Sequence, residues 1–309
     1  MSHIPSDGTS PTRPDRDVPV PDLAAIEAIV RRAIDERRPD LLTVVGNGEL
    51  TIALRWEHDG VDLVVKRMPP FPHRAAADEY IALVRRHVDD LARHGVRCVT
   101  TDLHSLTRAD GTVVVYHCQP LLTVELLADQ VLRCDDVSAE HPIVTAVVDH
   151  VVRAVRGGVP VDAQFANWYW FDGEVWQLDL STPLYVDGRG DICFDSTGFQ
   201  REYPAALRRI VYKELMKVAP NYSDVEWVLT DTMTQLHRQG LERWCVAVTE
   251  AAAQRHDITL DPALGKSRYD ADAKFFPTLL KMKRFQRAWV QRTGRRYDTL
   301  LPATTSFGR

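Results

Sequence analysis

The stretch of sequence that decides the fold runs from Val161 to Ser181 and reads VDAQFANWYWFDGEVWQLDLS. Aromatic and other strand-forming residues fill positions 168–171 and 174–178. The dipeptide Asp172-Gly173 between them is typical of a tight turn that joins two antiparallel strands. This stretch therefore predicts a β-hairpin, which brings the residues at its two ends together.

Three polar residues flank the predicted hairpin. Asn167 and Asp179 are its two ends and are expected to lie side by side, and Asp162 precedes them in the pattern Asp-x-x-x-x-Asn. A carboxylate oxygen and an amide oxygen placed in this way can share a magnesium ion. A carboxylate on the preceding loop can accept the proton of a hydroxyl nucleophile. The spacing predicts a phosphoryl-transfer site, with Asn167 and Asp179 as metal ligands and Asp162 as the catalytic base. Taken singly, each aspartate is equally typical of a helix cap or a turn.

This pattern resembles that of the protein-kinase-like superfamily, in particular its branch of aminoglycoside phosphotransferases and small-molecule kinases. The family pattern is His-x-Asp-x-x-x-x-Asn, a hairpin, and then Asp-Phe-Gly or a relative of it. Here Pro160 replaces the histidine, which in the family braces the catalytic loop, and Leu180-Ser181 replace Phe-Gly. The resemblance implies an α+β, bilobal protein-kinase-like fold, with a small β-rich N-lobe and a larger, mostly helical C-lobe. It also implies ATP and Mg²⁺ as cofactors.

Upstream, the sequence reads as strand, turn and strand around Gly46, Asn47 and Gly48. Glycines at such a turn let backbone amides approach phosphate oxygens, although Gly-Asn-Gly is also an ordinary hairpin turn. Lys66 ends a valine-rich strand about twenty residues later, where the family places a lysine that holds the α- and β-phosphates. The alternative is a solvated lysine that closes an edge strand. The interval from Lys66 to Asp162 resembles the layout of the family.

Apolar residues at helical spacing predict a helix over 74–93. Glu79 lies next to the apolar stripe. In the family a glutamate of this helix pairs with the strand lysine, so Glu79 is the candidate partner of Lys66, with Asp78 as the second choice. The alternative is a surface carboxylate on a charged helix.

The β-branched run 112–115 predicts a buried strand, which must stop at Pro120. The resemblance places the hinge between the lobes at this point. It implies that His117, Cys118 and Gln119 line the adenine site through their backbone groups.

The predicted organisation has three parts. Residues 1–19 are rich in Pro, Ser, Thr and Asp and are expected to form a disordered tail. Residues 20–119 form the N-lobe and residues 120–309 the C-lobe. Apolar periodicity predicts a helix at the start of the N-lobe and six in the C-lobe, over 22–37, 123–132, 143–156, 204–217, 223–239, 241–255 and 276–293.

Composition agrees with a soluble protein of two lobes. The 309 residues are 45% hydrophobic and 26% charged, which is ordinary for a globular chain long enough to bury two cores. No apolar run is long enough to cross a bilayer, and the N-terminus lacks the apolar core of a secretory signal. The five scattered cysteines show no disulfide or metal spacing, which predicts reduced thiols and a cytoplasmic location.

Two charged segments bear on the substrate. Asp187, Asp191 and Asp195 follow the predicted metal ligand and could attract a cationic or polyhydroxyl substrate, although solvated loop acids are the simpler interpretation. Segment 274–296 is rich in Lys and Arg and contains no acidic residue, in a chain whose net charge is −5. It is expected to be a basic helix docked on the C-lobe, or a surface for an anionic substrate, an acidic membrane or an acidic protein. The overall acidity argues against nucleic acid as the main partner.

The sequence therefore predicts an ATP- and Mg²⁺-dependent phosphotransferase that acts on a hydroxyl group of a small metabolite or antibiotic-like molecule. An alternative is a catalytically weak or inactive kinase-like protein, which binds nucleotide or a partner in a regulatory role. Replacement of the bracing histidine by Pro160 favours this alternative. A third interpretation is an unrelated α+β regulator without a nucleotide site, which would require all these spacings to be coincidental.

Overall fold

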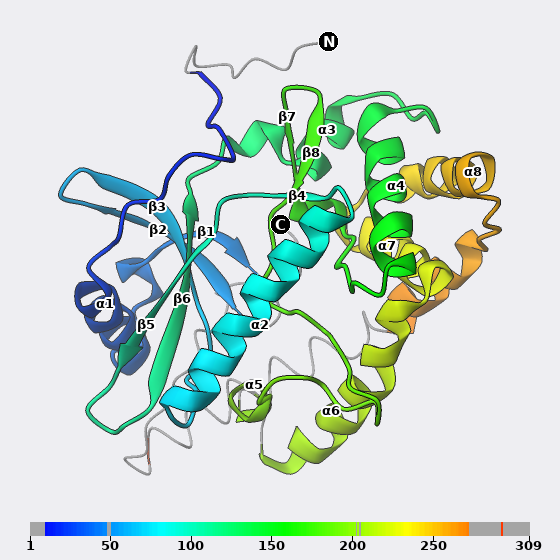
Figure 1. Ribbon diagram of the computed structural model, residues 1–309. Coiled ribbons are helices and arrows are strands. Elements are labelled where there is room, and N and C mark those ends of the chain that lie inside the picture. Colours follow the sequence, from blue (N-terminus) through cyan, green and yellow to red (C-terminus); the bar gives the residue numbers. More distant parts are fainter. Residues whose placement is uncertain (1–9, 48–50, 202, 204, 272–291, 293–309) are drawn as a thin grey trace.

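The computed structural model describes residues 10–47, 51–201, 203, 205–271 and 292. Over these residues the chain is an α+β protein with two parts, a five-stranded antiparallel sheet near the N-terminus and a helical C-terminal part (Figure 1). No helix among them is long and apolar enough to pass through a membrane.

The five-stranded sheet has the strand order β1-β2-β3-β6-β5, and every neighbouring pair is antiparallel. β6 lies inside the sheet and all eight of its residues are buried, as its run of β-branched residues predicts. Asp59 and Gly60, both with positive φ, form the turn between β2 and β3. The strands are β1 (Thr43–Asn47), β2 (Ile52–His58), β3 (Val61–Arg67), β5 (Asp102–Thr107) and β6 (Val113–Pro120).

Helices α1 (Leu23–Asp35) and α2 (Arg74–Arg93) cover opposite faces of this sheet (Figure 1). Side chains alternate along β6, so Val114 faces the α1 core while Val113 and Val115 face the core that includes α2. Both helices lie where the apolar periodicity predicts them, and α2 has the predicted bounds.

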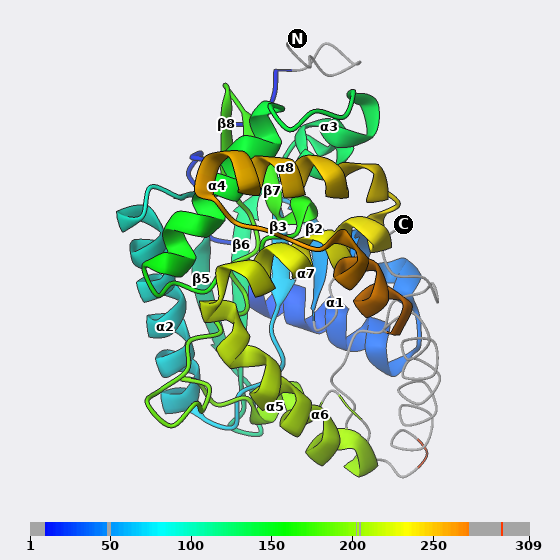
Figure 2. The same ribbon diagram turned by 90° about the vertical axis from the view of Figure 1, so that its right-hand side faces the viewer.

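The C-terminal part is built around α4 (Pro142–Arg156), which packs against α7 (Val225–Gln239) and α8 (Cys245–His256) (Figure 2). The valines of α4 recur every three or four residues and pack into the largest core cluster. The other helical elements of this part are α3 (Ala128–Cys134), α5 (Thr197–Arg201), α6 (Ala205–Val218), and the 3-10 turns η2 (Val124–Leu126), η3 (Phe165–Asn167), η4 (Ala219–Ser223) and η5 (Glu242–Trp244). A further 3-10 turn, η1 (Pro39–Leu41), lies between α1 and β1.

A second sheet joins the two parts of the molecule. It has three strands in the order β4-β8-β7, namely β4 (Arg97–Cys98), β7 (Trp168–Phe171) and β8 (Glu174–Gln177). β4 comes directly after α2 and pairs in parallel with β8. The loop that precedes β7 and the segment that follows β8 are therefore held close to the end of α2.

The N-terminal stretch 10–18 corrects one prediction. The Thr12 amide donates to the Thr123 hydroxyl (3.1 Å), and the Tyr169 hydroxyl donates to the Thr12 carbonyl (2.9 Å). The Thr100 amide donates to the Pro14 carbonyl (2.8 Å), and Val18 is buried in the α1 core. The predicted disordered tail 1–19 is thus wrong for this stretch, because hydrogen bonds to both parts of the molecule hold it. Residues 1–9 lie outside the described residues, as does all of the predicted basic segment 274–296 except Arg292.

Candidate active site

The hairpin expected from the sequence is present, which confirms that prediction. β7 and β8 pair from Trp168↔Gln177 to Phe171↔Glu174, and the turn residues Asp172 and Gly173 have φ of 52° and 80°. Beyond the last strand pair, the Leu178 amide donates to the Asn167 carbonyl at 2.8 Å. Asp179 follows Leu178 directly. Asn167 and Asp179 are therefore on adjoining chain segments.

Lys66 and Asp179 form an ion pair between the five-stranded sheet and the end of the hairpin. The Lys66 Nζ atom lies 2.8 Å from Oδ2 of Asp179, and the two side chains are only 15% and 24% exposed. The other oxygen, Oδ1, accepts hydrogen bonds from the amide (2.9 Å) and hydroxyl (2.7 Å) of Ser181. Burial by itself would raise the pKa of Asp179, but the Lys66 charge and these hydrogen bonds outweigh it and hold the pKa well below its usual range. Asp179 is thus a fixed, ionised carboxylate.

Asp162 lies on the loop between α4 and η3. Its carboxylate accepts hydrogen bonds from the amide (3.4 Å) and the side-chain Nε2 (3.0 Å) of Gln164. Burial raises the pKa of Asp162 to about 7, and the negative charges of Asp179 and Asp231 contribute in the same direction. A carboxyl group that titrates near neutral pH can both accept and release a proton, which is the property of a general base.

Asn167 ends the 3-10 turn η3 and is 8% exposed. Its Nδ2 atom has no hydrogen-bond partner within the described part of the chain. A buried amide with an unpaired group is uncommon, because leaving such a group unsatisfied costs free energy. Asn167 therefore has hydrogen-bonding capacity that the surrounding protein does not use.

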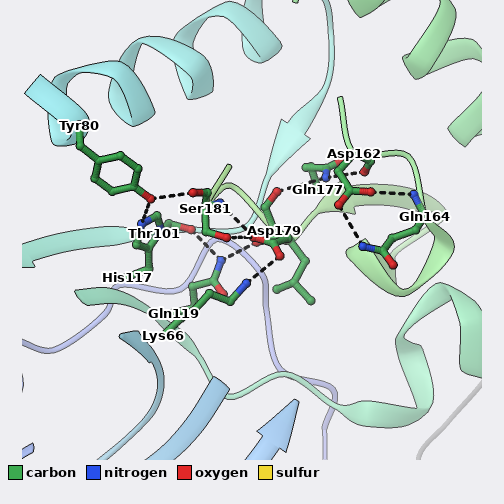
Figure 3. A network of polar contacts seen from close by, with 11 residues as sticks. Lys66, Tyr80, Thr101, His117, Gln119, Asp162, Gln164, Gln177, Asp179 and Ser181 are labelled. Atoms are coloured by element: carbon green, nitrogen blue, oxygen red, sulfur yellow. Dashed lines mark hydrogen bonds and ion pairs between the residues drawn. The ribbon is translucent and has the colours of Figure 1, made fainter. Parts of the chain in front are cut away.

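Two residues that the sequence does not single out connect these groups (Figure 3). The Nε2 atom of Gln177 donates to the backbone carbonyls of Asp162 (3.2 Å) and Asp179 (3.4 Å). The Tyr80 hydroxyl donates to the Ser181 carbonyl (2.8 Å) and lies 2.8 Å from Nε2 of His117. Neither Gln177 nor Tyr80 belongs to a sequence motif, so only the folded structure reveals these contacts.

The structure contradicts the predicted pairing of Lys66 with Glu79. Glu79 is exposed on α2, and Lys66 pairs with Asp179 instead. The buried stripe of α2 passes through Tyr80, one position further along, which is the residue that faces the site. Asp78, the second choice, is also exposed and pairs with Arg74.

His117, Cys118 and Gln119 belong to β6, and their side chains alternate between the faces of the sheet. His117 is the register partner of Lys66, and burial followed by the Lys66 charge lowers its pKa to about 3, so it is neutral. Cys118 faces the α1 core. Gln119 Nε2 donates to the Thr101 hydroxyl and to the Leu178 carbonyl, both at 2.8 Å.

The strand position of these residues also bears on their predicted role. β6 lies between β3 and β5, which both pair with His117 and Cys118, so the sheet already uses their backbone groups. Because β6 continues to Pro120, the connection to the helical part begins after that residue. This pairing argues against the predicted contact of adenine with the backbone of His117 and Cys118, whereas the same role for Gln119 stays a prediction.

Two of the three residues predicted for the glycine-rich turn lie in a strand instead. Gly46 and Asn47 belong to β1, where Gly46 pairs with Ala53 next to a shift in register and Asn47 pairs with Ile52. Gly48 lies outside the described residues.

Comparison with known proteins places the site inside a protein family. A family model described as a family of unknown function (DUF6206) matches residues 25–262. This range includes every candidate site residue named above. No curated protein matches the sequence.

Proposed function

The chain belongs to the DUF6206 family of unknown function, so its chemistry must be inferred from the site, and we propose that it is an ATP- and Mg²⁺-dependent phosphotransferase. The acceptor in this proposal is a hydroxyl group of a small molecule. The observation that carries the proposal is the ion pair of 2.8 Å between Lys66 of the sheet and Asp179 at the hairpin end, close to a carboxyl group of raised pKa, Asp162.

The topology supports a kinase-like arrangement of the two parts. The sheet is antiparallel with the spatial order β1-β2-β3-β6-β5. Along the chain, α2 follows β3 and precedes β5 and β6. β6 then leads directly into the helical part, which contributes the hairpin. This layout agrees with a bilobal fold in which nucleotide binds between the sheet and the hairpin.

Lys66 supplies the positive charge of the proposed nucleotide site. Its ammonium group is a compact charge with three donors, which suits the oxygens of a phosphate chain. Asp179 keeps this group in place before nucleotide arrives, because the two side chains are in direct contact.

Asp162 is the proposed general base. Its carboxyl group is oriented by Gln164 and titrates at about pH 7, so it can take the proton of an acceptor hydroxyl under neutral conditions. Positioning and charge neutralisation supply most of the acceleration in such sites, and the base contributes about 10²- to 10⁴-fold.

Asn167 and Asp179 are the proposed magnesium ligands. They offer the amide and carboxylate oxygens that Mg²⁺ prefers. The unpaired atom of Asn167 is its Nδ2 donor, which cannot bind the ion, so in this proposal the side-chain oxygen of Asn167 is the ligand. The described residues contain no cluster of three or more His, Cys, Asp or Glu side chains that could hold a metal ion, so the proposal requires substrate phosphates and water to complete the coordination shell. Bound magnesium would supply charge neutralisation along the phosphate chain.

A second function, nucleotide binding without turnover, is favoured by one specific observation. Lys66 pairs with Asp179 rather than with a glutamate of α2, and both oxygens of Asp179 already accept contacts from Lys66 or Ser181. Magnesium would have to compete with these contacts. In this case nucleotide would bind without magnesium, and replacement of Asp162 would leave nucleotide binding unchanged.

The test is transfer of the γ-phosphoryl group of ATP, with water and a panel of hydroxylated metabolites as acceptors. Phosphorylated products are detected by mass spectrometry for wild type, Asp162→Asn and the control Asp172→Asn, which changes an exposed residue of the hairpin turn. We expect magnesium-dependent product that is lost only in Asp162→Asn. Equal product from wild type and Asp162→Asn would contradict the proposed base, and absence of product with every acceptor would favour the second function.

A further inference from the structure

We infer that Gln177 is a positioning residue, which holds the loop of Asp162 against the chain segment of Asp179. Its Nε2 atom donates to the carbonyl of Asp162 at 3.2 Å and to the carbonyl of Asp179 at 3.4 Å. In Figure 3 the side chain lies between the two aspartates, with its amide directed at both backbones. One amide group thus fixes the separation of the proposed base and the proposed metal ligand.

The chemistry of the partners determines the orientation of this amide. Both partners are carbonyl oxygens, which only accept hydrogen bonds, so the nitrogen of Gln177 must face them. The opposite atom, Oε1, is buried and has no partner among the residues that the structure describes. The side chain is therefore incompletely satisfied, although Gln177 is only 2% exposed. Such incomplete satisfaction concentrates at functional positions, because an apolar side chain would pack there at a lower cost.

The backbone of Gln177 is held on both sides. β8 lies between β4 and β7, and Gln177 is paired with Cys98 on one side and Trp168 on the other. Its carbonyl also accepts a hydrogen bond from the Val99 amide at 2.9 Å. The amide that contacts the two aspartates therefore projects from a strand in the middle of a sheet. Rigid placement of this kind is what a positioning residue requires.

Gln177 can take over the bracing role of the missing histidine. In the family that the sequence resembles, a histidine braces the catalytic loop, and here Pro160 occupies its position. The structure has a brace that comes from the hairpin strand instead, and it acts on the backbone of Asp162 itself. The catalytic meaning of this brace rests on the proposed function, whereas the brace as a structural contact does not.

The first test compares Gln177→Met with the control Glu174→Gln. Methionine keeps the length of the side chain and removes the donor, whereas Glu174 is an exposed residue of the same strand whose carboxylate forms an ion pair with Arg97 at the surface. We expect Gln177→Met to lower kcat for hydrolysis of magnesium–ATP by about 10- to 100-fold while the Kd for ATP stays within about twofold. Glu174→Gln should behave as wild type. Gln177→Met leaves two carbonyls without this donor, so its melting temperature should fall by a few degrees, and the assay is run at a temperature where both variants are fully folded.

Hydrogen–deuterium exchange supplies a readout that does not depend on turnover. Amides in segments 160–164 and 178–182 should exchange faster in Gln177→Met than in wild type or in Glu174→Gln, because the link between the segments is removed. Unchanged exchange in both segments would overturn the inference. If wild type shows no turnover but exchange changes as expected, the brace stands and the proposed function fails.

Discussion

The ammonium group of Lys66 lies 2.8 Å from the carboxylate of Asp179, although the two residues are far apart in the sequence. Lys66 comes from the third strand of the five-stranded sheet, and Asp179 follows the hairpin of the helical part. The pair therefore joins the two parts of the molecule at the point where the proposed phosphate site lies. It also replaces the lysine–glutamate pair expected from the resemblance.

Removing the lysine should weaken nucleotide binding and stability together. Lys66→Met leaves the Asp179 carboxylate largely buried without its partner, which should lower the free energy of unfolding by about 1–3 kcal/mol. We expect the Kd for ATP to rise at least about tenfold, measured by isothermal titration calorimetry. The control is Lys266→Met, which breaks an exposed pair with Asp270. Equal ATP affinity in wild type and Lys66→Met would exclude the proposed phosphate contact.

Asp162 should link activity to pH. A base must be deprotonated to act, so kcat/KM should rise with pH through about 7, the raised pKa of this carboxyl group. A pH profile of ATP hydrolysis from pH 5 to 9 checks this. A flat profile across neutral pH would contradict the assignment of Asp162 as the base.

The same carboxyl group should reduce stability at high pH. Its pKa is higher in the folded protein than the ordinary value of 3.8, so the folded state binds more protons between about pH 4 and 7. Stability from this group is therefore present at low pH and is lost as pH rises to 7. Asp162→Asn should melt at a higher temperature than wild type at pH 8, and the difference should shrink at pH 5. A lower melting temperature for Asp162→Asn at pH 8 would contradict this account.

Tyr80 should connect α2 to the Asp179 segment. Its hydroxyl donates to the Ser181 carbonyl, and since its one proton is used there, it accepts from His117 Nε2. Tyr80→Phe leaves two buried groups unpaired, which should cost about 1–3 kcal/mol in the free energy of unfolding. Urea denaturation of this variant and of the control Tyr212→Phe, which changes a half-buried residue of α6, measures the difference. Equal stability of the two variants would show that this contact contributes nothing.

Glu79 should have no role in the site, because it is exposed on α2. Glu79→Gln is expected to keep ATP affinity and turnover within about twofold of wild type, as is usual for surface changes. A loss of activity comparable to that of Lys66→Met would instead restore the lysine–glutamate pair that the resemblance implies.

The elements with strong local signals could be predicted from the sequence. The bounds of α2 follow from its apolar spacing, and the hairpin at 168–177 follows from its strand formers and its Asp172-Gly173 turn. These local patterns were sufficient to bring Asn167 and Asp179 onto adjoining segments.

Other features depend on contacts that no local pattern encodes. Glu79 and Tyr80 are consecutive, and only the packing of α2 decides which of them faces Asp179. The ordered stretch around Thr12 is held by single hydrogen bonds to Thr123 and Tyr169, which a polar, proline-containing sequence does not reveal. The bridge made by Gln177 likewise requires the folded positions of both aspartates.

The central claim is a magnesium-dependent nucleotide site at Asp179, and thermal shift measures it most directly. ATP is added with and without Mg²⁺ to wild type and to Asp179→Asn, with Asp172→Asn as the matched control. The account predicts that ATP raises the melting temperature of wild type and of Asp172→Asn more strongly when magnesium is present, and that this increment is lost in Asp179→Asn. An equal increment in Asp179→Asn, or no response of wild type to ATP with magnesium, would contradict it.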